Sequence, residues 1–517
     1  MAASGRAAIS DPQGGSRNLQ AVAPWIFALA ATLLGLAAGW AALHFSGAFH
    51  LRLSLIHIAL LAAALLAAVP VMRRPALGVV ALIFLVYLNV SDILIRFHDL
   101  PSLLQLLAIP LLLAVLVEWR RGALKGLEPK AVTVALAAYV LVFVVSSVVA
   151  QEPVLADARA VEAAKGFGIF VLILLLATRP ERVRAGAWAL VGGGLLLAGL
   201  SLFQVVTGAY RNDFGGLARV EHAQVYGHVL ESRLAGPIGD PNFFAQILVI
   251  VVPVALVLAW KERTRWLRLL AVVAAAATAA TTIFTYSRGG ALALGVVALC
   301  SLFAAHPSRR RVTIGAALLL VAGLALVPTQ FARRLVTLRA LLPGEEPTLE
   351  LDSSVQYRVL LAQVAWRLFL DHPVLGAGAG NYAVHYYEYA DEVGSTALDY
   401  REAGGARYPH SLYLELASET GFLGLITFGT MILLVFGHLR RAEEAYFTAG
   451  DELHAALASA LAIALLGFLI SSLFLHGHFQ RYLWVLLGLS AALAAAAPAV
   501  TDAGSLAGGG PTMEERV

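Results

Sequence analysis

The sequence contains little charge. Only 14% of its 517 residues are Asp, Glu, Lys or Arg, whereas 59% are hydrophobic. A soluble protein with this balance would need a very large core to bury its apolar runs, so a soluble fold is disfavoured. The formal net charge of +4 is too small to indicate a nucleic-acid partner, and none is expected.

Cysteine and the common catalytic motifs are also scarce or missing. The single cysteine, Cys300, excludes an intrachain disulfide, and its apolar surroundings suit a small core residue. The sequence has no Walker loop, no GxSxG or HExxH motif and no Cys/His cluster. No spacing supports a metal site, so we expect neither a metal nor another cofactor.

Long hydrophobic runs are what the sequence has instead. Several exceed the roughly 18 residues that a helix needs to cross a bilayer. They predict an all-α fold, a polytopic transmembrane helix bundle of about fourteen spans, with about twelve as the lower limit. The expected spans lie near 24–43, 53–71, 76–95, 101–118, 131–150, 161–178, 185–207, 243–260, 267–285, 290–305, 312–329, 411–437, 454–475 and 482–498.

Alternate loops differ in positive charge. Lys and Arg are dense at 119–130, 179–184, 261–268 and 306–311, and sparser in the short loops between them. Because cytoplasmic loops of membrane proteins are enriched in these residues, the pattern predicts that both termini are cytoplasmic. The expected order is a disordered tail at 1–22, about eleven spans in 23–329 with a long outer loop at 208–240, a large outer loop at 330–410, about three spans in 411–498, and a disordered tail at 499–517.

The large outer loop is expected to contain an amphipathic helix. Asp352 or Ser353 can cap its start, and Pro373 stops it before a Gly-Ala-Gly-Ala-Gly-Asn turn at 376–381. Apolar residues recur at helical spacing in between, which predicts a buried face. That face comprises Val355, Val359, Ala362, Trp366 and Phe369.

Four polar patches fall on the outer side of the predicted membrane. The first comprises Arg233, Asp240 and Asn242 before an apolar run, where an N-cap role for Asp240 is an equally simple interpretation. The second comprises Ser287 and Arg288 in the sequence Tyr-Ser-Arg-Gly-Gly, where the arginine can instead extend to lipid headgroups.

The third patch is Arg358 on the amphipathic helix, which a solvated helical face would also explain. The fourth lies where the large loop returns to the membrane: His410 and Tyr413 precede Glu415 and Glu419, which are i, i+4 neighbours. Such a stripe faces lipid only at high cost, so we expect it to line a cavity, although pairing of its carboxylates with arginines is an alternative.

Together these patches predict a cavity that binds phosphate. A guanidinium binds phosphate oxygens through two parallel hydrogen bonds, and a histidine can accept or donate a proton near neutral pH. These groups suit displacement of a phosphate leaving group by a hydroxyl, with arginines stabilising the departing charge and a base activating the nucleophile.

Four stretches over about 230–440 occur in an order that resembles a known family. They read GPIGDPNFFAQ, YSRGG, YRVLLAQVAWRLFLDHPVLGAGAGNY and PHSLYLELASETGFLGL, with a weaker echo in HFQRYLWVLLGL. The set resembles the O-antigen ligase and O-antigen polymerase superfamily of bacterial envelope enzymes. The resemblance implies a fold similar to other lipid-dependent glycosyltransferases, in the inner membrane, with its active site facing the periplasm.

The resemblance also implies a reaction and its residues. Family members take a glycan from an undecaprenyl-pyrophosphate carrier, without a metal, and pass it to the lipid A core or to a second lipid-linked glycan, in lipopolysaccharide or exopolysaccharide synthesis. The family's two arginines and histidine correspond by motif to Arg288, Arg358 and His410, which would hold the pyrophosphate and help to activate the acceptor. The residues expected to shape the substrate cavity are Arg233, Asp240, Asn242, Ser287, Tyr413, Glu415 and Glu419.

Two departures from the family leave ligase and polymerase both open. Ser411 follows the histidine where ligases commonly have asparagine, and the expected span number is closer to that of some polymerases. A few relatives have been labelled bicarbonate transporters, so a small-anion transporter stays an alternative, as does a non-catalytic envelope scaffold. Charges gathered at one interface argue against transport, which usually places ionisable residues near the bilayer midplane.

Overall fold

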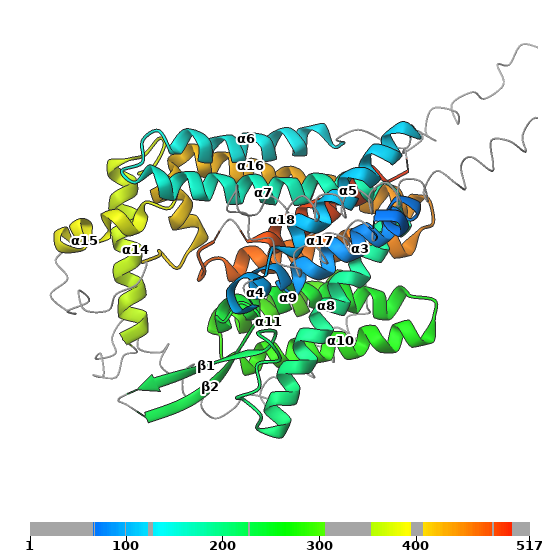
Figure 1. Ribbon diagram of the computed structural model, residues 1–517, viewed down its shortest axis with the longest axis horizontal. Helices are drawn as coiled ribbons and strands as arrows, with labels where there is room; N and C mark the ends of the chain where they lie inside the picture. Colours follow the sequence, from blue (N-terminus) through cyan, green and yellow to red (C-terminus); the bar gives the residue numbers. More distant parts are fainter. Residues whose placement is uncertain are drawn as a thin grey trace, which may run out of the picture.

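The structure is a computed structural model that describes residues 66, 68–98, 100–122, 128–225, 228–304, 353–393, 407–477 and 480–498. Most described helices run alongside one another in a bundle, and a two-stranded sheet, α14 and α15 lie at one end of it (Figure 1). The helices are α3 (Pro75–Tyr87), α4 (Val90–His98), α5 (Leu103–Arg120), α6 (Lys130–Ser146), α7 (Pro153–Leu176), α8 (Pro180–Thr207), α9 (Pro241–Lys261), α10 (Arg265–Phe284), α11 (Arg288–Ala304), α14 (Ser353–Asp371), α15 (Tyr382–Glu392), α16 (Leu412–Thr448), α17 (Glu452–Ser471) and α18 (Arg481–Ala495).

Several of the described helices can cross a membrane. Six are long and apolar enough, namely α5, α8, α9, α10, α16 and α17, and a seventh span results if α3 and α4, bent by 52° at their junction, are taken together. The chain is therefore a mostly helical membrane protein. The expected spans at 24–43 and 312–329, and most of that at 53–71, lie outside the described residues, so the total of about fourteen stays a prediction.

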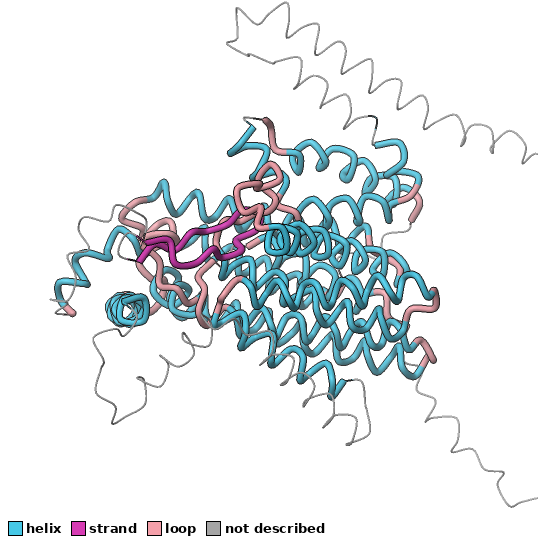
Figure 2. Tube along the Cα trace, turned by 90° about the horizontal axis from the view of Figure 1, so that it is seen from below, coloured by secondary structure: helices cyan, strands magenta, loops and turns pink. Residues whose placement is uncertain are grey.

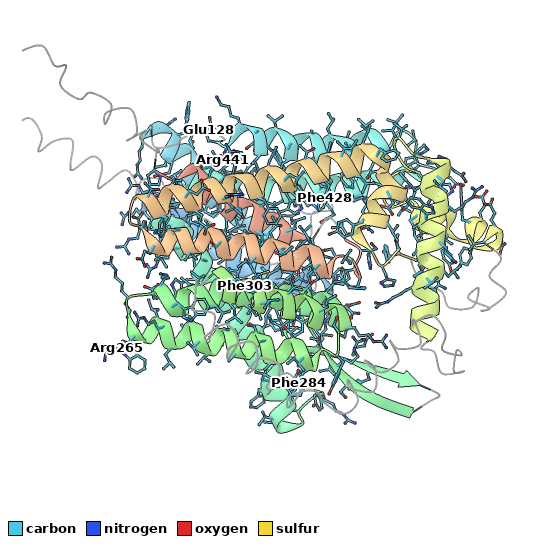
Figure 3. All side chains as sticks on the ribbon, turned by 180° about the vertical axis from the view of Figure 1, so that it is seen from behind. Glu128, Arg265, Phe284, Phe303, Phe428 and Arg441 are labelled. Atoms are coloured by element: carbon cyan, nitrogen blue, oxygen red, sulfur yellow. The ribbon has the colours of Figure 1, made fainter. Side chains whose placement is uncertain are left out.

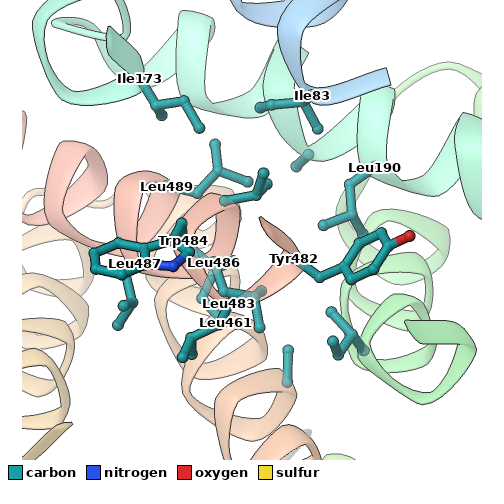
Figure 4. Close-up of a cluster of buried hydrophobic side chains, with 14 of the residues drawn as sticks. Ile83, Ile173, Leu190, Leu461, Tyr482, Leu483, Trp484, Leu486, Leu487 and Leu489 are labelled. Atoms are coloured by element: carbon teal, nitrogen blue, oxygen red, sulfur yellow. The ribbon is translucent and has the colours of Figure 1, made fainter. Parts of the chain in front are cut away.

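The short helix α18 lies inside the bundle. Every residue from Tyr482 to Leu493 is buried. Side chains of α18 such as Trp484 and Leu489 lie among residues of its neighbours, including Ile173 of α7 and Leu190 of α8 (Figure 4). In a bilayer such packing is stabilised mainly by van der Waals contact, because lipid tails are as apolar as the helix itself.

The all-α prediction missed a β-hairpin in the loop 208–240. Strands β1 (Arg219–Val225) and β2 (His228–Gly236) pair antiparallel, with Glu221 opposite Arg233, and lie beside the end of the bundle (Figure 2). An isolated two-stranded hairpin is marginally stable. Here Arg233 fastens it to the bundle, because its Nε donates to the carbonyl oxygen of Thr285, the residue after α10, at 3.0 Å.

The amphipathic helix predicted in the large loop is confirmed as α14, which ends two residues before Pro373. Its predicted buried face is wrong at two positions, because Val359 is 49% exposed and Trp366 is 53% exposed. Asp352 and the side chains of Ser353 and Val355 lie outside the part of the chain that the structure describes. The face that is buried packs against α15 and comprises Leu361, Val364, Ala365 and Leu368.

The glycine-rich turn at 376–381 fastens α14 and α15 to α16. The amide of Ala377 donates to the carbonyl of Ser418 at 2.9 Å, and that of Gly378 donates to the carbonyl of Glu419 at 3.1 Å. These carbonyls approach the turn where α16 is interrupted at Gly421, whose φ of 64° and ψ of −158° are not helical. The first turns of α16 and the large loop therefore form one connected unit.

We expect Gly421→Ala to lower the melting temperature of the purified protein markedly. A Cβ there would lie 2.4 Å from the carbonyl oxygen of Val374, in a backbone conformation that only glycine adopts readily. Strain of this kind alone costs roughly 1–3 kcal/mol. Gly429→Ala is the matched control. A Cβ added at this later position of α16 would have open space around it, with no packing neighbour within 4 Å. Equal melting temperatures for the two variants would contradict this role of Gly421.

Candidate functional site

The predicted site residues are gathered at the end of the bundle that carries the hairpin and α14. Helices α9, α11 and α16 begin at this end, and α10 and α17 end there. A hydrogen bond joins two of these helix ends: the amide of Leu412, the first residue of α16, donates to the carbonyl of Ser472, directly after α17, at 3.0 Å. The opposite end carries arginines such as Arg265, the first residue of α10, and Arg441 in the later part of α16 (Figure 3). The four polar patches therefore share one end of the bundle, and their side of the membrane stays a prediction.

His410 lies just before α16 in a stack of rings. It has a φ of 49°, an uncommon conformation for a residue other than glycine, which turns the chain directly into the helix. Its ring meets that of His476 edge to face, with centroids 5.3 Å apart, and His476 stacks flat on Tyr408 at 4.2 Å. Phe243, in the first turn of α9, also meets the ring of His476 edge to face, with centroids 5.2 Å apart.

Titratable groups from four different segments act on His410. Burial, and then the neighbouring His476 and Arg358, lower the pKa of His410 from 6.5 to about 4, while Asp240 and Glu415 act in the opposite direction. Arg358, Asp240 and Glu415 therefore all lie close enough to act on this imidazole. The structure thus brings Asp240 close to His410, although the two are more than a hundred positions apart in the sequence. With a pKa of about 4, His410 is neutral at physiological pH.

We expect the pH dependence of kcat/KM to reveal this environment. A histidine with its ordinary pKa would become protonated near pH 6.5, but His410 accepts a proton only as the pH falls towards about 4. The glycan transfer that the sequence predicts, measured at subsaturating donor, should therefore persist through pH 6 and fall at lower pH. In Arg358→Ala, which loses a positive charge, the acid limb should move to higher pH. An acid limb at pH 6.5 in both proteins would contradict this assignment.

The patch before α9 has a structural role as well as a place in the site. The carboxylate of Asp240 accepts hydrogen bonds from the amides of Asn242 at 2.7 Å and Phe243 at 3.2 Å, so the N-cap interpretation is confirmed. Asn242 in turn accepts from Arg233 at 3.3 Å, and Arg233 also pairs with Glu221 on β1. The hairpin is thus tied to the helix whose start adjoins His410.

The start of α11 is built similarly. The hydroxyl of Ser287 accepts from the amide of Gly290 at 3.2 Å, which caps the helix. Arg288 is the first residue of α11 and is partly exposed. The next residue, Gly289, lies against Phe474, because a Cβ added there would be 2.8 Å from its ring. Arg288 therefore borders the segment that carries His476.

The two glutamates of α16 are buried, with only 1% of Glu415 and 2% of Glu419 exposed. We predicted that they line a cavity, and the structure gives both of them backbone donors. Glu415 accepts from the amide of Gly477 at 2.6 Å, and Glu419 accepts from the amides of Gly380 at 2.7 Å and Tyr382 at 3.4 Å. These carboxylates hold in place the segment after His476 and the glycine-rich turn after α14. Their positions thus support the two elements that bring His476 and Arg358 to the site.

Tyr413 also has a partner within the fold. Its hydroxyl donates to the carbonyl of Leu469 at 2.9 Å, which joins the first turn of α16 to the last turns of α17. Its ring packs against the main hydrophobic core. A role in substrate binding stays a proposal for Tyr413, whereas its role in joining these two helices is a property of the structure.

Sequence reasoning missed three aromatic or basic residues at this site. His476 and Tyr408 form the ring stack described above, and Arg407 donates to the hydroxyl of Tyr357, the neighbour of Arg358, at 2.9 Å. The guanidinium of Arg407 also lies over the rings of Tyr357, at 5.7 Å, and Tyr386, at 5.8 Å. His476 lies two residues before the weaker motif near the end of the chain, and a histidine where an apolar run leaves the membrane was the available signal.

These features define a helical membrane protein with a polar site of arginines and histidines at one end of its bundle. Within the described residues, no group of three His, Cys, Asp or Glu side chains is arranged to hold a metal ion. Residues 273–429 match the model of the O-antigen ligase family. The match confirms the predicted resemblance over the segment that holds Arg288, Arg358 and His410. Among curated proteins, none matches the chain.

Proposed function

We propose that this protein is an integral membrane glycosyltransferase that acts on glycans linked to undecaprenyl pyrophosphate. The observation that carries the proposal is the meeting of Arg358 and His410 at one end of a membrane bundle, within the segment that matches the O-antigen ligase family. The reaction takes place on the periplasmic face of the bacterial inner membrane. The donor is a lipid-linked glycan, and the acceptor is the lipid A core or a second lipid-linked glycan.

The proposed reaction is a displacement at the anomeric carbon of the glycan. A hydroxyl of the acceptor forms the new bond to this carbon, and the bond from the carbon to the pyrophosphate oxygen breaks. Undecaprenyl pyrophosphate leaves with the bonding electrons, and the hydroxyl proton passes to the imidazole of His410. His410 suits this step because it is neutral at physiological pH and so has a free lone pair.

Arg358 and Arg288 are proposed to stabilise the pyrophosphate as its negative charge increases. Each planar guanidinium can donate two parallel hydrogen bonds to phosphate oxygens, which an ammonium group cannot reproduce. The bound anion also changes His410. In the free protein the charge of Arg358 lowers the pKa of this histidine, and a pyrophosphate beside Arg358 offsets that charge and raises it. Donor binding therefore makes His410 a better base.

We expect His476→Ala to lower the rate of glycan transfer by about 10–100-fold, because the ring that positions His410 is lost. The acid limb of kcat/KM should move to higher pH in the same variant, since His476 contributes to the low pKa of His410. His476→Phe keeps an aromatic ring between Tyr408 and His410 and should recover part of the rate. If the alanine variant keeps both the wild-type rate and the wild-type pH profile, His476 has no positioning role.

One assay tests the proposal and distinguishes its two forms. Purified protein in lipid vesicles is incubated with an undecaprenyl-pyrophosphate-linked repeat unit, with and without a lipid A core acceptor, and the products are sized. Longer lipid-linked chains without the acceptor identify a polymerase, and transfer that requires the acceptor identifies a ligase. No product under either condition, across several donor glycans, would contradict the proposal.

A further inference from the structure

Helix α14 exposes a stripe of large apolar side chains. Val359 is 49% exposed, Trp366 53% and Leu370 50%, and their spacing places them on one face of the helix. The opposite face is covered by α15 and contains Leu361, Val364 and Leu368. An exposed apolar stripe on a helix that is already packed on its other side indicates contact with something other than water.

The stripe continues onto the outward surface of a membrane-crossing helix. The ring of Phe369 in α14 contacts that of Phe422 in α16 at 5.0 Å, and the amide of Phe422 donates to the carbonyl of Pro373 at 2.8 Å. On α16, Phe422 is 51% exposed and Ile426 is 60% exposed. Among the described residues, only 33% of the most apolar part of α16 is buried by protein, as expected of a helix with a lipid-facing surface. Between α14 and α16, Val374 adds a further apolar side chain, 61% exposed.

The position of α14 fits the surface of a membrane. It runs across the end of the bundle at a steep angle to α16 (Figure 1). Tryptophan is favoured at the level of lipid headgroups, where its ring is partly in apolar and partly in polar surroundings. Beside the stripe lies a polar flank, where Arg367 pairs with Asp371 at 3.8 Å and with Glu392 at 3.5 Å. An apolar face with a tryptophan and a charged flank is typical of helices that lie in the bilayer interface.

We propose that Val359, Trp366 and Leu370 lie in the interface of the lipid bilayer, and that the membrane itself is the partner of this face of α14. The apolar surface of α16 then continues without interruption into the headgroup region. One consequence rests on the proposed function: Arg358, adjacent to Val359, is held at the depth where the pyrophosphate of a lipid carrier lies. The membrane contact itself does not depend on any catalytic role.

Spin labelling tests the contact, and the chain has a single cysteine to remove. In a Cys300→Ser background, Trp366→Cys and Leu370→Cys are each labelled with a nitroxide and reconstituted into lipid vesicles. Ile426→Cys is the lipid-facing reference, and Glu388→Cys, on a side chain that is 70% exposed in α15, is the aqueous reference. Arg367→Cys is the matched control on α14. Collisions with oxygen report lipid, and collisions with a water-soluble nickel complex report solvent.

We expect the labels at 366 and 370 to favour oxygen over nickel, as at Ile426, and the label at Arg367 to be shifted towards the nickel response of Glu388. Labels at 366 and 370 that respond as at Glu388 would overturn the proposal. Low access to both reagents would also overturn it, because protein would then cover the face. In that case, spin–spin broadening that disappears on dilution with unlabelled protein would identify a second copy as the cover. Loss of glycan transfer in any variant leaves these readings valid, so a failure here is separate from a failure of the proposed function.

Discussion

Replacing His410 by alanine is expected to slow glycan transfer by about 10²–10⁴-fold, the range over which general acid–base groups contribute. The residue lies beside Arg358, is neutral at physiological pH and is held in place by the ring of His476. Donor binding should change much less than the rate, because in the proposed mechanism the imidazole acts on the attacking hydroxyl rather than on the pyrophosphate. Initial rates at saturating donor and a separate binding titration distinguish the two effects.

The matched control for this substitution is His372→Ala. His372 is an exposed histidine directly after α14, on the same loop. Its variant should insert, purify and transfer glycan as the wild-type protein does. Comparable losses in the two variants would show that the loop tolerates no change, and a His410→Ala variant with full activity would exclude a chemical role for His410.

Replacing Arg358 by lysine is expected to reduce kcat/KM by roughly 10²-fold or more, although the positive charge is retained. A guanidinium holds two phosphate oxygens at once, whereas an ammonium holds them only as a point charge. If the interaction is stronger in the transition state than with bound donor, the loss falls on kcat. If it is equally strong in both, the loss falls on KM.

The control for this substitution lies on the same helix. Arg367 is half exposed and pairs with Asp371 and Glu392, away from His410. Arg367→Lys should therefore leave both constants close to those of the wild-type protein. A fully active Arg358→Lys variant would contradict bidentate recognition of the pyrophosphate and would favour a purely electrostatic or structural role for Arg358.

The bundle was largely predictable because its signal is local. Runs such as those that form α9 and α17 are almost wholly apolar, so their helices follow from composition and length alone. The ends of the helices that carry the site were predictable for a related reason. A polar residue such as Asp240 or His410 beside an apolar run marks the point where the chain enters the bilayer, and such points on one side of the membrane are close in space.

Other features depend on contacts between distant segments and were not predictable in this way. The hairpin around Glu221 and Arg233 has a polar sequence, and it is held by a hydrogen bond to Thr285 that no local pattern reveals. On α14 two apolar stripes overlap, and only packing against α15 decides which of them is buried. His476 became visible as a site residue only when α17 placed it against Tyr408 and His410.

The release of undecaprenyl pyrophosphate tests the proposed chemistry most directly. Purified protein, a labelled lipid-linked glycan and an acceptor are mixed in vesicles, and the free carrier pyrophosphate and the extended acceptor are measured over time. We predict one carrier pyrophosphate released for each glycosidic bond formed, with both products reduced in the same proportion in His410→Ala and in Arg358→Ala. Transfer that continues unchanged in both variants, or carrier release without a new glycosidic bond, would contradict displacement at this site.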